Sequence, residues 1–142
     1  MAQESKPSKD LVVGGWTNPA GKAHDLWMVF KDPNSYIQSE LAPSQAPCVF
    51  KLEGLEDPVT GEGHMVSYQY QKNADGGKQI DITVELREAY ASEDQPGRLI
   101  ARGHHGNVPA GWQSGSFALT KPEADAIRRY DDLYLRVVAH QP

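Results

Sequence analysis

The sequence predicts a mainly β protein: an antiparallel β-sandwich or jelly-roll-like barrel, with one short helix near the C-terminus and an extended N-terminal arm. Three observations support this fold class. Short segments of alternating polar and apolar residues recur along the chain and are separated by turn-rich connections. The chain has 13 glycines and 10 prolines, which favour turns over long helices. A full set of helix-start signals is found at one place, Thr120.

Length and composition exclude several classes of protein. The 142 residues fit one domain that can bury a core without disulfides or metals. The formal net charge is −5 and no basic cluster occurs, so the electrostatic signature of a nucleic-acid-binding protein is absent. No apolar run is long enough to span a bilayer, and no hydrophobic signal region starts the chain, so we expect a soluble protein that is not exported by the usual route. Cys48 has no second cysteine to pair with, and its apolar neighbours predict a small buried side chain.

The N-terminus is expected to form an arm over residues 1–13, followed by a single β-sandwich domain over residues 14–142. Residues 1–10 are polar, charged and interrupted by proline, so they cannot bury enough apolar surface to order themselves. Ten extended residues reach about 33 Å, so the arm is long enough to cross a neighbouring subunit. We therefore expect a partner chain to hold it, and the candidate contact residues are Lys6, Lys9, Leu11 and Val12.

The next two elements are predicted as strands. Leu26–Phe30 is a continuous apolar run that stops at a Lys-Asp-Pro-Asn turn. Cys48–Glu53 alternates, with Cys48, Phe50 and Leu52 on one face. Residues 16–21 before them contain the Asn, Pro and Gly of a turn.

The middle of the chain predicts an antiparallel hairpin. Residues 64–71 alternate, and residues 72–78 carry a strong turn signal. Residues 79–88 then form the clearest strand of the chain. Its inward side chains are expected to be Ile80, Ile82, Val84 and Leu86. Its water-facing side chains are expected to be Asp81, Thr83, Glu85 and Arg87.

The last part of the chain continues with strands and one helix. Residues 98–103 and 113–119 are predicted to be extended. Thr120 and Glu123 have the spacing of a capping box, Pro122 suits the first turn, and Leu119 can pack on Ala124. From residue 133 the period changes to two, which predicts a final strand. A helix this short cannot form its own core, so we expect it to plug one end of the β-structure.

Few residues suggest chemistry. His104-His105, with His64, His24 or an acid, could in principle bind a metal, but adjacent residues of a strand point to opposite faces, which favours loop or surface roles. There is no Gly-x-Ser-x-Gly elbow, no His-x-x-x-His helix motif and no phosphate-binding loop. We predict no enzyme, no catalytic residue, no cofactor and no metal site.

Trp16 and Trp112 are the remaining recognition candidates. Both lie in Gly-rich loops, where an indole either closes one end of the core or stacks on a sugar or a partner protein. Trp27 lies in an apolar run and is expected in the core. Together with Tyr90, the two loop tryptophans suggest a glycan-binding β-sandwich as an alternative function.

Several motifs resemble small virion proteins of tailed bacteriophages, over most of residues 15–139. The resemblance is carried by Gly15-Trp-Thr17, residues 35–39, Ile82-Thr-Val-Glu-Leu-Arg87 and, above all, the stretch from Leu99-Ile-Ala to Val138. That stretch contains a Leu-Thr-x-x-Glu helix start at residues 119–123 and a Tyr-x-x-Leu-x-Leu-Arg strand at residues 130–136. In that family these motifs are structural, so the resemblance implies a place in the virion and transfers no active-site residue.

Within the virion, the resemblance and the small β-domain favour a capsid decoration, or cement, protein on the outer surface of the head, made in the host cytoplasm. Its expected partners are the major capsid protein and copies of itself, as a homotrimer at three-fold positions, with no membrane or nucleic acid. A head-fibre base, a tail or neck adaptor, and a module that binds a host-surface glycan are the alternatives.

Overall fold

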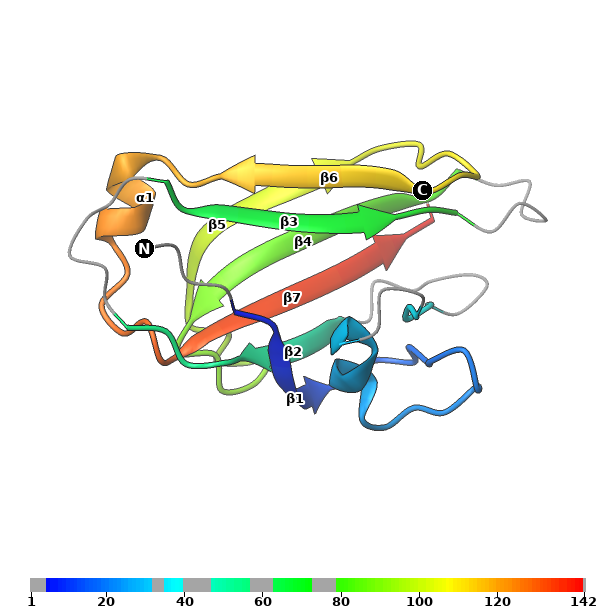
Figure 1. Ribbon diagram of the computed structural model, residues 1–142, viewed down its shortest axis with the longest axis horizontal. Helices are drawn as coiled ribbons and strands as arrows, with labels where there is room; N and C mark the ends of the chain where they lie inside the picture. The colour runs from blue at the N-terminus through cyan, green and yellow to red at the C-terminus, as the bar shows by residue number, and fades with distance from the viewer. Residues whose placement is uncertain (1–4, 32–34, 40–46, 57–62, 73–78, 142) are drawn as a thin grey trace.

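The protein is described by a computed structural model that places residues 5–31, 35–39, 47–56, 63–72 and 79–141. These residues form two antiparallel sheets, a 3-10 helix and one short α-helix (Figure 1). The larger sheet has the order β1 (Pro7–Val12), β2 (Cys48–Leu52), β7 (Leu133–His140), β4 (Asp81–Glu88) and β5 (Arg98–His105). The smaller sheet pairs β3 (Met65–Tyr70) with β6 (Gln113–Ala118). The predicted mainly β class, with one short helix near the C-terminus, is confirmed.

The two sheets form a sandwich-like arrangement, with buried apolar side chains on the inner face of the larger sheet. Figure 1 shows the β3–β6 ribbon lying over the β4 and β5 half of the larger sheet. Val66 of β3 and Phe117 of β6 pack against the buried cluster that contains Leu86 of β4. The β2 half of the same face is covered by the 3-10 helix η1 (Leu26–Lys31), whose Leu26 is fully buried with Phe50. The inner face of the larger sheet is therefore covered by the ribbon on one half and by a helical turn on the other.

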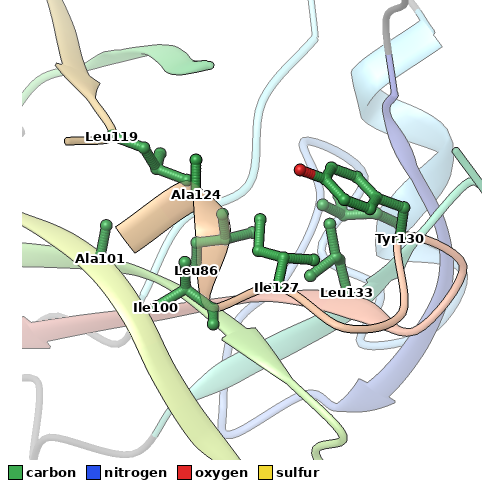
Figure 2. Close-up of a cluster of buried hydrophobic side chains, with 9 residues drawn as sticks. Leu86, Ile100, Ala101, Leu119, Ala124, Ile127, Tyr130 and Leu133 are labelled. Atoms are coloured by element: carbon green, nitrogen blue, oxygen red, sulfur yellow. The ribbon is translucent and has the colours of Figure 1, made fainter. Parts of the chain in front are cut away.

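The end of the sandwich is closed by α1 (Lys121–Asp125), as the capping signals predict. The Thr120 hydroxyl accepts from the Glu123 amide at 3.3 Å, and the Glu123 carboxylate accepts from the Thr120 amide at 2.8 Å. This is a complete capping box. Figure 2 shows the side chains that converge under the helix, among them Leu119, Ala124, Ile127, Tyr130 and Leu133. The helix acts as a plug, because it adds a small apolar face to a core that the strands supply.

The N-terminal segment is extended, but residues 7–12 pair with β2 of the same chain instead of standing apart from the domain. Leu11 and Val12 pack against a second buried cluster, on the other side of the larger sheet, that contains Val49, Tyr90 and Tyr134. The polar composition of residues 1–10 suggested that they could not become ordered within their own domain. They do so because a strand can be stabilised by backbone pairing and by the apolar surface of its neighbours. Residues 1–4 of the expected arm lie outside the described residues.

The predicted strand over Leu26–Phe30 is wrong, because these residues form η1. The Asp10 carboxylate accepts from the Leu26 and Trp27 amides at 2.8 and 2.9 Å and so caps the first turn. Leu26 and Val29 are buried, whereas Met28 is 54% exposed, which is the three-residue period of a 3-10 helix. An uninterrupted apolar run hides that period from the sequence. Trp27 is half-buried against the Leu26–Phe50 cluster, so its expected core role is confirmed in a helix instead of a strand.

The predicted hairpin between residues 64–71 and 79–88 is also wrong. β3 pairs with β6, and β4 pairs with β5 on one edge and β7 on the other. The local turn signal over residues 72–78 falls largely outside the described residues. β4 is a central strand, since its backbone pairs along its whole length with β7 and along most of it with β5. These pairings link distant segments and override the local turn signal.

Glu85 was expected to face water and is instead only 5% exposed. It lies on the outer face of the larger sheet, where Arg136 Nη1 and Arg87 Nε each donate to Glu85 Oε1 at 3.0 Å. A carboxylate at this position is tolerated because two guanidinium groups neutralise it. Val84 and Leu86 are buried as predicted, but burial does not alternate along the strand, because Glu85 and Glu88 are buried as well and Ile82 is only half-buried.

Candidate binding surface

The outward face of the β3–β6 ribbon carries hydroxyl and amide groups, the exposed apolar side chain of Met65 at one end, and no charge. Ser67 pairs with Ser116 across the two strands, and Gln69 pairs with Ser114. All four side chains are exposed, and neither strand contains Asp, Glu, Lys or Arg. We call these four residues the polar strip. They contribute to an open hollow of about 420 Å³ whose floor includes Gly115 and Tyr68.

One end of the polar strip is marked by two exposed aromatic side chains. Trp112 directly precedes β6, two residues before Ser114, and is 52% exposed. Tyr36, from a distant part of the chain, is 38% exposed, and its ring centroid lies 6.1 Å from that of Trp112 at a tilt of 58°. An aromatic pair of this geometry is a rigid amphipathic surface.

The floor of the strip depends on two close approaches of the backbone. A Cβ atom at position 115 would lie 2.5 Å from Tyr68 Cε2, and one at position 103 would lie 2.6 Å from Tyr68 Oη. Glycine at both positions lets the Tyr68 ring pass between the two sheets. Gly103 belongs to β5 and Gly115 to β6, so this packing connects the ribbon to the larger sheet.

Tyr68 and Tyr70 also hold His105 between the sheets. Tyr68 Oη is hydrogen-bonded to His105 Nε2 at 2.6 Å, and the Tyr70 ring stacks on the imidazole at a centroid distance of 4.2 Å. Burial, and then the charge on His104, lower the pKa of His105. Burial raises the pKa of the Tyr68 hydroxyl. The environment therefore favours the neutral forms of both groups.

On the opposite face of the larger sheet, Glu85, Arg87, Arg136 and Glu93 form one ion-pair network. Arg136 donates to Glu93 at 2.6 and 3.1 Å in addition to its bond with Glu85, and Tyr90 donates to Glu93 at 2.7 Å. The hydrogen bond from Arg136 lowers the pKa of Glu93. The network ties the connection between β4 and β5 to β7, so a structural role explains it.

Glu88 is the second buried carboxylate, at 5% exposure. Its Oε2 accepts from the backbone amides of Arg128 and Arg129 at 2.6 and 2.8 Å, and its Oε1 is paired with Arg98. Neither amide has a helical partner, because both follow the end of α1. Glu88 therefore fastens the segment after α1 to the end of β4, which is also a structural task.

The sequence-predicted contact residues are not brought together. Lys6 and Lys9 are exposed, and Leu11 and Val12 are half-buried against the Tyr90 cluster. Trp16 is 6% exposed and closes the cluster around Leu26 and Cys48, which is the core alternative stated for it. Tyr90, named with the tryptophans for glycan binding, is 3% exposed and is therefore no surface aromatic. Trp112 is the loop tryptophan that lies at the surface.

The histidines are distributed over separate contacts. His104 Nδ1 is 2.8 Å from Thr83 Oγ1, while His105 faces Tyr68, so the adjacent pair does point to opposite sides of β5. His64 Nε2 is 2.8 Å from Tyr130 Oη, and His24 lies beside Asp25. Within the placed part of the chain, no group of three or more His, Cys, Asp or Glu residues is arranged to hold a metal ion.

Sequence reasoning did not find most of the candidate surface. Tyr36, Ser67, Gln69, Ser114 and Ser116 were not singled out as binding residues. The signal in the sequence that could have indicated this surface is that two strand segments lack any charged residue in a chain with 23% charged residues. That they form one surface depends on the pairing of β3 with β6, which joins positions about 50 residues apart.

The fold and this surface define an antiparallel β-sandwich-like domain with an uncharged exposed ribbon. No protein-family model, curated protein or solved structure matches the chain. Among the described residues, no helix has the length and apolar character required to cross a membrane.

Proposed function

We propose that this chain is a noncatalytic structural protein of a tailed-bacteriophage virion, and specifically a capsid decoration protein that binds the major capsid protein on the outer surface of the assembled head. The supporting observation is where the motifs that resemble small virion proteins lie in the fold. Leu86, from the motif that ends at Arg87, and Ile100, Leu119, Tyr130 and Leu133, from the stretch between Leu99 and Val138, belong to one buried cluster. The resemblance therefore concerns residues of the hydrophobic core, which proteins with a common fold and a common structural role would have in common.

A noncatalytic role agrees with the use of the ionisable groups. Glu85 and Glu88 are paired with arginines, and His105 is kept neutral between two tyrosines. A catalytic acid or base needs access to a substrate and a partner group in reach of it. Neither buried glutamate has that access, since each is 5% exposed.

Binding to the assembled head would stabilise it by mass action, because the decoration protein binds the shell and not the free subunits. A homotrimer at three-fold positions is the expected form. The β1 edge is one face available for such contacts, since Lys6 and Lys9 are exposed there. A deletion of residues 1–13 is a poor test, because it removes β1 and uncovers Val49 and Tyr134.

The test is co-sedimentation of the full chain with capsid shells, followed by cryo-electron microscopy of decorated particles. We expect density on the outer surface at three-fold positions, and we expect the double substitution Lys6→Glu and Lys9→Glu to weaken attachment. Lys22→Glu, another exposed lysine, is the matched control. Density at the neck, tail or fibre base would replace the decoration role with an adaptor role, and absence from the virion would refute the proposal.

A further inference from the structure

We propose that the polar strip and the Trp112–Tyr36 pair together form a binding site for a neutral oligosaccharide. This inference goes beyond attachment to a capsid, which requires no small ligand, and it does not depend on that attachment. It rests on three properties of the surface: its charge, its hydrogen-bonding groups and its aromatic end.

The absence of charge selects the class of ligand. The chain carries 33 charged residues in 142, yet the β3 and β6 strands carry none. Because neither strand carries lysine or arginine, the polar strip itself offers no cation to pair with phosphate, sulfate or a carboxylated sugar. A surface without acids has no means to bind a basic peptide. Uncharged sugars, which present only hydroxyl, ring-oxygen and acetamide groups, fit such a face.

The strip offers the hydrogen bonds that such a ligand needs. Serine hydroxyls both donate and accept, and the Gln69 carboxamide supplies two donors and an acceptor. Residues 112, 114 and 116 are spaced along one extended segment, so they cover about 13 Å at 3.3 Å per residue. Ser67 and Gln69 on the paired strand widen this row to two side chains. The row has the dimensions of a short oligosaccharide, not of a single ring.

The aromatic end supplies the apolar part of sugar recognition. One face of a pyranose ring presents C–H groups that pack on an indole or phenol ring, and exposed Trp and Tyr side chains provide this contact with little loss of conformational entropy. Trp112, at 52% exposure, has half of its surface available, and Tyr36 fixes one side of it. The side-chain amide of Gln113 donates to the backbone carbonyl of Gly111 at 3.4 Å, so this hydrogen bond links the two residues on either side of Trp112.

The floor under the strip is rigid, which favours binding by a preformed surface. Tyr68 is wedged against Gly103 and Gly115, and its hydroxyl is bonded to His105. A protein partner is the competing occupant. The centre of a protein interface is enriched in aromatic residues, methionine and arginine, and Met65 beside the strip is 62% exposed. The four residues of the strip itself are hydroxyl and amide side chains, which favours the sugar there.

The experiment uses the full chain against an array of neutral and acidic glycans, followed by a two-dimensional NMR titration with soluble cellohexaose, maltohexaose, chitohexaose and mannohexaose. We expect at least one neutral probe to bind with a Kd on the order of 0.1 mM. The amide signals of residues 67–69 and 112–116 should shift. Trp112→Ala should weaken binding roughly tenfold or more, as expected for an aromatic anchor.

Leu99→Ala is the matched control, because Leu99 is also an exposed apolar side chain, at 41%, but lies on β5 opposite Arg87. It should bind like the unmodified chain, and the thermal midpoint of each variant checks that it is folded. The proposal is overturned if no neutral probe shifts these signals at several millimolar, if only acidic glycans bind, or if Trp112→Ala leaves the affinity unchanged.

Shell co-sedimentation separates this proposal from the capsid role. Trp112→Ala that loses sugar binding and still sediments with shells supports a sugar site distinct from the capsid contact. The opposite result would be that the unmodified chain binds no sugar and that Trp112→Ala no longer sediments with shells. The strip would then be a contact with the capsid protein, and the sugar site alone would be refuted.

Discussion

Removal of the Glu88 carboxylate should be among the most damaging single changes in this fold. Glu88→Ala deletes the acceptor for the Arg128 and Arg129 amides, at 2.6 and 2.8 Å, and the partner of Arg98. Hydrogen bonds to a charged acceptor contribute about 1.5–3 kcal/mol each, but both amides are near the surface and can recover part of this from water. The Arg98 pair adds little, because that side chain is 42% exposed. We expect a loss of about 3 kcal/mol in the free energy of unfolding.

The assay is urea denaturation monitored by tryptophan fluorescence, with Glu88→Gln and Asp131→Asn as companions. Glu88→Gln keeps one acceptor oxygen for the two amides but loses the charge and the acceptor that faces Arg98, so it should lose about 1–2 kcal/mol. Asp131 is 62% exposed and pairs with Arg129, so its change should cost less than about 0.5 kcal/mol. If Glu88→Ala costs no more than Asp131→Asn, the carboxylate does not fasten the segment after α1, and the structural account of it fails.

Three further outcomes follow from the packing between the sheets and under β2. Folding lowers the pKa of His105, so its contribution to stability is complete above the ordinary pKa near 6.5 and is lost as the pH falls below that value. The urea midpoint should therefore decline as the pH falls below about 6.5, and His105→Phe should reduce this decline. Gly115→Ala should cost about 1–3 kcal/mol, because its Cβ would lie 2.5 Å from the Tyr68 ring, whereas Gly111→Ala, with nothing within 4 Å, should be nearly neutral. Cys48 is fully buried and burial raises its pKa, so a thiol reagent should label it only in step with unfolding by urea.

Each of these three predictions has its own contradicting result. An unchanged pH slope in His105→Phe would assign the acid sensitivity to another group. Equal stability of the Gly115→Ala and Gly111→Ala variants would show that the Tyr68 ring can move aside without cost. Fast labelling of Cys48 in the absence of urea would show that the cluster around Phe50 opens locally in the native state.

The elements that the sequence predicted well are those whose cause is local. The capping box at Thr120 needs two side chains three residues apart, and β7 shows a plain two-residue period from Leu133. β5 and β6 were placed within two residues for the same reason. In each case the side chains that determine the backbone lie within one turn or one strand of each other.

The failures concern contacts between distant parts of the chain. Leu26–Lys31 becomes helical because Asp10, 16 residues earlier, caps its first amide. β3 and β4 are separated because each finds a better partner elsewhere in the sheets. The candidate surface was not predicted for the same reason, since Tyr36 lies beside Trp112 only because the β-structure places their two loops together. No periodicity within a single segment could reveal these pairs.

The position of β7 has a consequence for biosynthesis. It is the last strand along the chain but lies in the middle of the larger sheet, bonded to β2 on one side and β4 on the other (Figure 1). Until β7 has left the ribosome, β2 and β4 both present an unpaired edge, and such edges pair readily with other chains. The larger sheet can therefore be completed only once β7 is available, by pairing over long sequence separations, which is slow. A truncation within residues 133–140 should accordingly yield aggregated chains and not a smaller folded domain.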